Sequence, residues 1–156
     1  MLKNNLISLA DQVFPAINTM FTSTARDRDG HEKWVDFLAR FWHLECVSKV
    51  SLSVFAQNYQ KWCKKLGYNF AQSKAERIHV LASNHFSLLP KDSFTKTLIM
   101  QTIMQYNNIC ETAAELKAEM NNIAATLPEY ETVLEMHGIG KTLTPQLIAE
   151  IGDIIH

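Results

Sequence analysis

Apolar residues recur every three or four positions along almost the whole chain, which is the spacing of one face of an α-helix. The first series stops just before Pro15, because a proline restricts the residue before it and usually ends a helix. Its members are Leu2, Leu6, Leu9 and Val13. A polar stretch over 22–30 carries the Asp, Ser and Gly chemistry of a connector. With only 5 glycines to build hairpins, the pattern predicts an all-α helical bundle.

Aromatic residues mark the helices of the first half. Their spacing predicts one amphipathic helix over 34–44 and a second over 54–62, which ends near Gly67, a plausible C-cap. Ser73 followed by Glu76 resembles a capping box at the start of a further helix. We expect the aromatic side chains of these helices to form the core.

The strongest periodic signal lies within 94–127. Its seam positions alternate steps of three and four without a slip, which is the repeat of a coiled coil, and no Gly or Pro interrupts them. These positions are Ile99, Thr102, Tyr106, Ile109, Ala113, Leu116, Met120, Ile123 and Leu127. So narrow a stripe packs against its own chain or against a second copy. We expect oligomerisation through the positions from Tyr106 to Leu127.

Composition narrows the classes of protein. A chain of 156 residues with 47% hydrophobic residues has room for one core, and a formal charge of -1 gives no overall basic field. The cysteines Cys46, Cys63 and Cys110 are odd in number and widely spaced, so a disulfide framework is not expected. No apolar run reaches the roughly 20 residues of a membrane span. We expect a soluble, cytoplasmic protein.

The chain has a near-neutral net charge because two blocks of opposite charge cancel. Residues 47–80 hold six cations against Glu76 alone, among them Lys61, Lys64 and Lys65. Residues 110–135 hold six glutamates against a single lysine. Both blocks are compatible with solvated helix faces. The alternative is that the basic block binds a phosphate backbone and the acidic helix faces away from it.

The C-terminal part predicts a helix, a tight turn and a second helix. The turn is the segment from His137 to Lys141, which contains Gly138 and Gly140. In a helix-hairpin-helix, the glycines let the turn close and the amides at the start of the second helix bind one phosphate without reading sequence. Lys141 would add a charge there. The alternative is an ordinary turn between packed helices.

Other chemistry finds less support in the sequence. Gly140-Lys141-Thr142 lacks the glycine that a P-loop requires five residues before Gly140. His43 and Cys46 have the spacing of a ligand pair, but no second pair completes a zinc site. Cys63 lies among lysines that could lower the pKa of its thiol, yet no general base accompanies it. We therefore predict no catalytic residue and no metal ligand in this chain.

The tail resembles a known family. Leu127-Pro128, the segment LEMHGIG over 134–140 and LIAEIGD over 147–153 are similar to the start of the C-terminal domain of IS110/IS116/IS902 transposases. Upstream segments occur in the same order as in that family. They are NNLISLADQVFP at 4–15, FLARF at 37–41, Lys74-Ala75 and Ala82-Ser83.

The resemblance implies a DNA-recombining enzyme of insertion elements. Family members have a RuvC-like domain with acidic ligands for a divalent metal such as Mg²⁺, then a coiled coil, then a domain with a catalytic serine. It further implies that 1–90 follows the missing RuvC-like core, that 94–127 is the coiled coil, and that 128–156 opens the transposase domain. The implied partners are DNA, an element-encoded guide RNA in some members, and further copies of the chain.

This chain departs from the family at Thr144-Pro145, where small residues are usual. A proline there removes one amide from the predicted phosphate site, and Thr144 then becomes the expected cap. Two functions remain as hypotheses. The first is an oligomerising, nucleic-acid-binding part of a transposase, inactive alone. The second is a helical protein-interaction scaffold that binds no nucleic acid.

Overall fold

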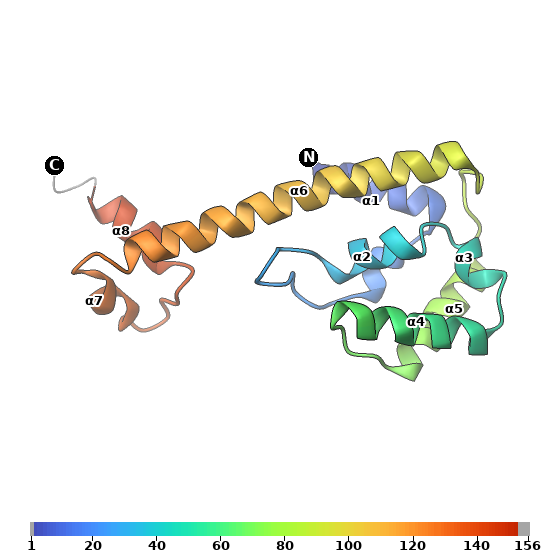
Figure 1. Ribbon diagram of the computed structural model, residues 1–156, viewed down its shortest axis with the longest axis horizontal. Coiled ribbons are helices and arrows are strands. Elements are labelled where there is room, and N and C mark those ends of the chain that lie inside the picture. The colour runs from blue at the N-terminus through green and yellow to red at the C-terminus, as the bar shows by residue number, and fades with distance from the viewer. Residues whose placement is uncertain (1, 153–156) are drawn as a thin grey trace. The chain divides into compact units, whose positions relative to one another are not determined.

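The computed structural model describes residues 2–152, and within them the chain is all-α, as the periodicity predicts. The described residues form α-helices and one 3₁₀ helix, and no strand occurs among them (Figure 1). They divide into two compact units, which are described separately. Among the described residues, unit 1 comprises 2–26 and 31–109, and unit 2 comprises 27–30 and 110–152. No helix in the described part is long and apolar enough to span a membrane.

Unit 1 contains six helices and the first half of a seventh. The helices are α1 (Leu2–Val13), η1 (Ile17–Met20), α2 (Lys33–Arg40), α3 (Glu45–Ser48), α4 (Leu52–Leu66), α5 (Gln72–Asn84) and α6 (Ser93–Ala124). In Figure 1, α3, α4 and α5 lie together, and α5 contacts both of the others. The predicted end of the first helix before Phe14-Pro15 is confirmed.

Aromatic side chains form much of the core of unit 1, as the sequence predicts, and the structure arranges them around one ring. Phe37 of α2 is fully buried, and its ring centre lies 4.7–6.5 Å from six other aromatic rings. Those rings belong to Phe14, Phe21, Phe41, Phe55, Tyr59 and Trp62. Aromatic pairs at such distances add specific edge and offset contacts to the free energy of burial. This ring cluster therefore fixes α2 against α4.

Glycine and serine define the ends of α4. The Ser51 hydroxyl accepts a hydrogen bond from the Val54 amide at 3.3 Å, which caps the N-terminus. Gly67 closes the C-terminus with φ +74°, a left-handed conformation that favours glycine. The predicted C-cap is confirmed. Val54, the first residue of the predicted stripe, is nearly half exposed.

Two local predictions were also wrong. The helix expected over 34–44 ends at Arg40, and the chain turns before α3, so that Trp42 is buried without being helical. Tertiary packing of the aromatic side chains decides this break. The capping box at Ser73 does not form, because α5 begins at Gln72, one residue earlier, after an Ala71 N-cap with no side-chain bond. Ser73 therefore lies inside the helix.

The predicted long helix is present as α6, which begins one residue before the expected range 94–127 and ends three residues before the end of that range. Asp92 precedes it and accepts a hydrogen bond from the Thr95 amide at 2.8 Å. That bond lowers the pKa of the Asp92 carboxyl below its ordinary value. A carboxylate at this position also interacts favourably with the helix dipole.

Unit 2 contains the second half of α6 followed by two short helices. These are α7 (Tyr130–Leu134) and α8 (Thr144–Gly152), which contact each other. Its buried side chains are few and include Ala124, Val133 and Thr144. The helix, turn and helix expected from the sequence are therefore present. Asp153, the last residue of the family-like tail, lies outside the described residues.

Candidate nucleic-acid interface

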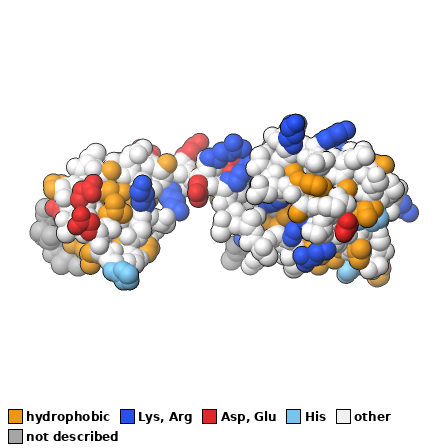
Figure 2. All heavy atoms as spheres, turned by 90° about the horizontal axis from the view of Figure 1, so that it is seen from below, with side chains coloured by type: hydrophobic (Ala, Val, Ile, Leu, Met, Phe, Trp, Pro, Cys, Tyr) orange, Lys and Arg blue, Asp and Glu red, His pale blue; other side chains and the backbone are white. Residues whose placement is uncertain are grey.

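The lysines predicted to bind nucleic acid lie on the last turns of α4 in unit 1. Lys61, Lys64 and Lys65 are all exposed, because Trp62 and Cys63 face the core between them. None of the three lysines pairs with a carboxylate within 4 Å in the described part of the chain. On the face shown in Figure 2, Lys and Arg side chains form separate patches among uncharged and hydrophobic atoms. The α4 lysines are therefore a local cationic surface.

An open groove adjoins this surface. It has a volume of about 700 Å³ and is lined mostly by uncharged polar residues. The lining residues are Ser51, Leu52, Ser53, Ala56, Gln57, Gln60, Phe70 and Gln72. Gln57 and Gln60 lie one helical turn before Lys61 and Lys64, so the groove and these lysines share a face of α4. The side-chain amides can donate and accept hydrogen bonds beside the cations.

The predicted hairpin residues lie in unit 2, between α7 and α8. Gly138 has φ +85°, so the turn uses a conformation that favours glycine, whereas Gly140 has no positive φ. Lys141 is exposed. The expected amide donors are largely used within the chain. The Thr144 amide bonds to the Gly140 carbonyl at 3.1 Å, and Pro145 has no amide hydrogen.

Thr144 does not cap α8 in the expected way. It is the first residue of α8, and its hydroxyl donates to the Gly140 carbonyl at 3.1 Å. An N-cap side chain would instead accept a hydrogen bond from an amide of the first turn. The turn is therefore held by bonds to Gly140, and Lys141 is exposed, as are His137, Gly138 and Gly140.

The seam positions of α6 are mostly buried in the first part of the helix and exposed in the second. Ile99 and Tyr106 are buried in unit 1, so the first part of the seam packs against its own chain. From Ile109 onward the seam is exposed: Ile109 is 58% exposed, Leu116 56% and Ile123 60%. Ala113, Met120 and Leu127 are exposed as well. Exposed apolar side chains at regular helical spacing are typical of an interaction surface.

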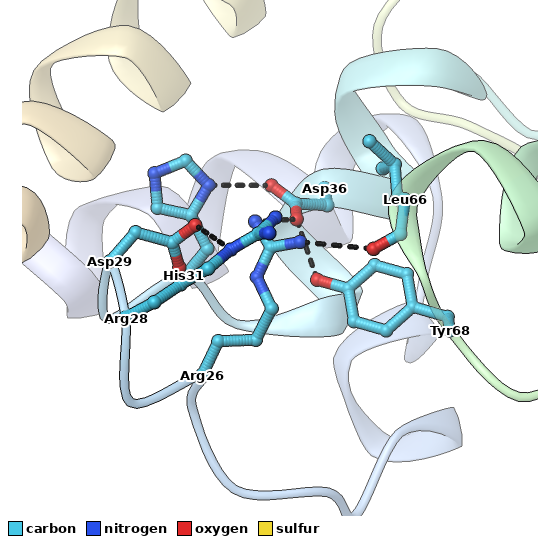
Figure 3. Close-up of polar contacts among 7 residues, drawn as sticks. All are labelled: Arg26, Arg28, Asp29, His31, Asp36, Leu66 and Tyr68. Atoms are coloured by element: carbon cyan, nitrogen blue, oxygen red, sulfur yellow. Dashed lines mark hydrogen bonds and ion pairs between the residues drawn. The ribbon is translucent and has the colours of Figure 1, made fainter.

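A buried polar network was missed by sequence reasoning. The carboxylate of Asp36, on α2, accepts hydrogen bonds from the Tyr68 hydroxyl at 2.6 Å and pairs with Arg26 and His31 at 3.2 Å each (Figure 3). Arg26 also donates to the Leu66 carbonyl at the end of α4, at 3.3 Å. Bonded partners in this network are up to 40 positions apart, so only the fold brings them together. The network ties the connector to α2 and α4.

A second carboxylate joins α6 to the rest of unit 1. Glu32 accepts hydrogen bonds from Tyr106 and from the Trp34 indole at 2.9 Å, and pairs with Lys3 at 2.8 Å. Burial raises the pKa of Glu32, but the hydrogen bonds from Lys3, Tyr106 and Trp34 outweigh it and hold the pKa below its ordinary value. Glu32 is therefore ionised wherever unit 1 is folded at neutral pH.

Cysteine and histidine have structural roles here. Cys63 is fully buried, and burial raises the pKa of its thiol, although nearby Lys33 and Tyr59 act in the opposite direction. The pKa of this thiol is therefore raised, and not lowered as the neighbouring lysines could have done. His43 is buried and bonds through both ring nitrogens, to the Leu89 carbonyl and the Glu45 amide. The described residues contain no group of three or more His, Cys, Asp or Glu side chains that could hold a metal ion.

Comparison with protein-family models, with curated proteins and with solved structures finds no match for this chain.

Proposed function

We propose that this chain is a self-associating, nucleic-acid-binding part of an insertion-element transposase of the IS110/IS116/IS902 type. The family part of the proposal rests on the order of the sequence segments and on the Gly-Ile-Gly tail. The all-α fold, with a long helix followed by a helix, a turn and a helix, agrees with that order. Catalytic groups belong to parts of such an enzyme that this chain does not match.

One observation carries the nucleic-acid part of the proposal. The three lysines at the end of α4 are exposed and unpaired with any carboxylate in the described residues. A phosphate backbone is recognised by such unneutralised cations, and contacts of this kind position a protein without reading base sequence. The amide-lined groove beside them supports the assignment, because Gln57 and Gln60 can bond to sugars or base edges.

Binding to fluorescent duplex DNA and to a structured RNA tests this part. The variant with Lys61, Lys64 and Lys65 changed to Glu should lose at least tenfold in affinity at low salt. The matched control changes Lys91 and Lys96, two exposed lysines near the start of α6, to Glu. The two variants reverse three and two charges, so their losses are compared per reversed charge. Equal losses per reversed charge would show that only net charge matters and would refute a site on α4.

The second hypothesis, a protein-interaction scaffold, is favoured by the exposed α6 seam alone. Under the transposase proposal, the seam joins copies of this chain, because a heptad stripe is complementary to itself. Sedimentation equilibrium distinguishes the hypotheses: the transposase proposal predicts a dimer or larger assembly. A monomer at all concentrations, together with no nucleic-acid binding, would favour the scaffold.

A further inference from the structure

Two lysines from different helices converge in unit 1, away from the α4 lysines and from the hairpin. Lys33, on α2, donates a hydrogen bond to the Asn69 carbonyl at 3.0 Å. Lys74, on α5, donates to the Met20 carbonyl. Both side chains are partly buried, so these backbone bonds hold the two ammonium groups in defined positions.

The two ammonium groups contact the same aromatic ring, and each is close enough to the other's surroundings for Lys74 to repel Lys33 electrostatically. The Lys33 nitrogen lies 5.8 Å from the centre of the Phe21 ring, and the Lys74 nitrogen lies 5.7 Å from the same centre. Lys33 is also 5.1 Å from the Tyr68 ring centre. Cation–π attraction offsets part of the cost of placing the charges there. It leaves the net positive charge in place.

No carboxylate neutralises this pair in the described part of the chain. Neither lysine has an acidic partner within 4 Å, and Arg77, one turn after Lys74, adds a third positive charge. Burial lowers the pKa of both lysines. Cys63 acts in the opposite direction on the pKa of Lys33, whereas repulsion from Lys74 lowers it further. Repulsion from Arg77 lowers the pKa of Lys74. An ammonium group has three donors, so each lysine keeps donors beyond its backbone bond. Cations held close together without a counter-ion favour an anion.

We propose that Lys33, Lys74 and Arg77 form a binding site for one phosphate group. A phosphate brings negative charge and several acceptor oxygens, so it can accept from both ammonium groups and pair with the guanidinium at once. The phosphate belongs either to a nucleic-acid backbone or to a free phosphate ion. The site lies outside the residues on which the proposed function rests and stands independently of it.

Thermal unfolding followed by tryptophan fluorescence tests the site with inorganic phosphate as the probe. Phosphate is compared with chloride at equal ionic strength. A tenfold excess over Kd should raise the midpoint by about 3 °C in the native chain. Lys74→Gln and Arg77→Gln should remove the rise, whereas Lys96→Gln, an exposed lysine on α6, should keep it.

Lys74→Arg serves as the rescue variant, because it retains the charge and should recover the rise. Arg77 is exposed, so Arg77→Gln removes a charge without disturbing the core and keeps the test decisive if Lys74→Gln is unstable. A rise no larger with phosphate than with chloride would overturn the site. The same rise in Lys74→Gln and Arg77→Gln as in the native chain would also overturn it.

A fluorescent oligonucleotide identifies the source of the phosphate. If Lys74→Gln weakens oligonucleotide binding about tenfold as well as removing the phosphate effect, the site holds a backbone phosphate. If only the phosphate effect is lost, the site holds the free ion. Changing Lys61, Lys64 and Lys65 to Glu should leave the phosphate-induced rise intact, so failure of the α4 interface and failure of this site give different results.

Discussion

Replacing Asp36 with Asn tests whether the buried network stabilises unit 1. The substitution keeps the shape of the side chain but removes its charge and puts an NH₂ donor where one oxygen accepts hydrogen bonds. One carboxylate oxygen, Oδ2, faces the donors of Tyr68 and Arg26, and the other, Oδ1, faces His31. The orientation of the new amide decides which of the two oxygens is replaced. Two donors then face each other, and the ion pair between the Arg26 guanidinium and Asp36 is lost.

The magnitude follows from the burial of the pair. The side chains of Asp36 and Arg26 are 9% and 19% exposed, so solvent replaces little of what is lost. Breaking a buried ion pair by removing one partner costs about 3–5 kcal/mol. Arg26 keeps its bond to the Leu66 carbonyl and its contact with the Tyr68 ring, 5.2 Å away, so we expect the lower end, about 3 kcal/mol.

Urea unfolding followed by tryptophan fluorescence measures this loss in unit 1 specifically. The chain has 3 tryptophans, at positions 34, 42 and 62, and all lie in unit 1. A loss of about 3 kcal/mol lowers the urea midpoint by about 1–3 M, since the slope is about 1–3 kcal/mol per M. Asp27→Asn, an exposed aspartate of the same connector, is the control and should change stability by less than about 0.5 kcal/mol.

A double-mutant cycle with Tyr68→Phe then measures how much of this loss comes from the interaction between Asp36 and Tyr68. Because the two side chains share a hydrogen bond of 2.6 Å, their effects should be non-additive, with a coupling of about 1 kcal/mol or more. An Asp36→Asn variant within about 0.5 kcal/mol of the native chain would refute the role of the network. So would strict additivity of the two substitutions.

Three further predictions concern other parts of the chain. Glu32→Gln should destabilise unit 1 at neutral pH. Because the folded pKa of Glu32 is depressed, its contribution to stability is complete above the ordinary pKa of 4.5 and is lost as pH falls through the folded pKa. The urea midpoints of the variant and the native chain should therefore converge in acid, and a constant difference between them would contradict this. Gly138→Ala should destabilise unit 2 by about 1 kcal/mol because φ of Gly138 is +85°, whereas Gly140→Ala should leave unit 2 unchanged. Amide hydrogen exchange in α8 measures both substitutions, and equal effects would contradict the turn geometry. Leu116→Glu should dissociate the oligomer in sedimentation, whereas Lys117→Glu, one position off the seam, should not; a native mass in both would contradict a seam contact.

The elements predicted well are those specified by local sequence. Gly67 ends α4 because a left-handed residue closes the helix there, and the unbroken repeat before Leu127 requires one long helix. The end of α2 at Arg40 was missed, since the apolar spacing continues through Trp42 while packing around Phe37 breaks the helix. Periodicity identifies a buried side chain, but it does not show whether the backbone beneath it is helical.

The polar sites show the same division. The α4 lysines could be found from the sequence, because charge clusters within a few positions. The Asp36 network and the Lys33–Lys74 pair could not, because their partners are brought together from distant positions by the aromatic core. An aspartate within the apolar pattern of α2 was the available signal, since a buried carboxylate requires donors.

The salt dependence of DNA binding tests the central claim, that the α4 lysines contact a phosphate backbone, most directly. Affinity for duplex DNA should fall with salt along a log–log slope of about −3 or steeper, because each neutralised phosphate contributes about −0.9. Changing Lys61, Lys64 and Lys65 to Gln should make the slope shallower by about 2.7. Binding that does not depend on salt, or an unchanged slope in this variant, would contradict the account.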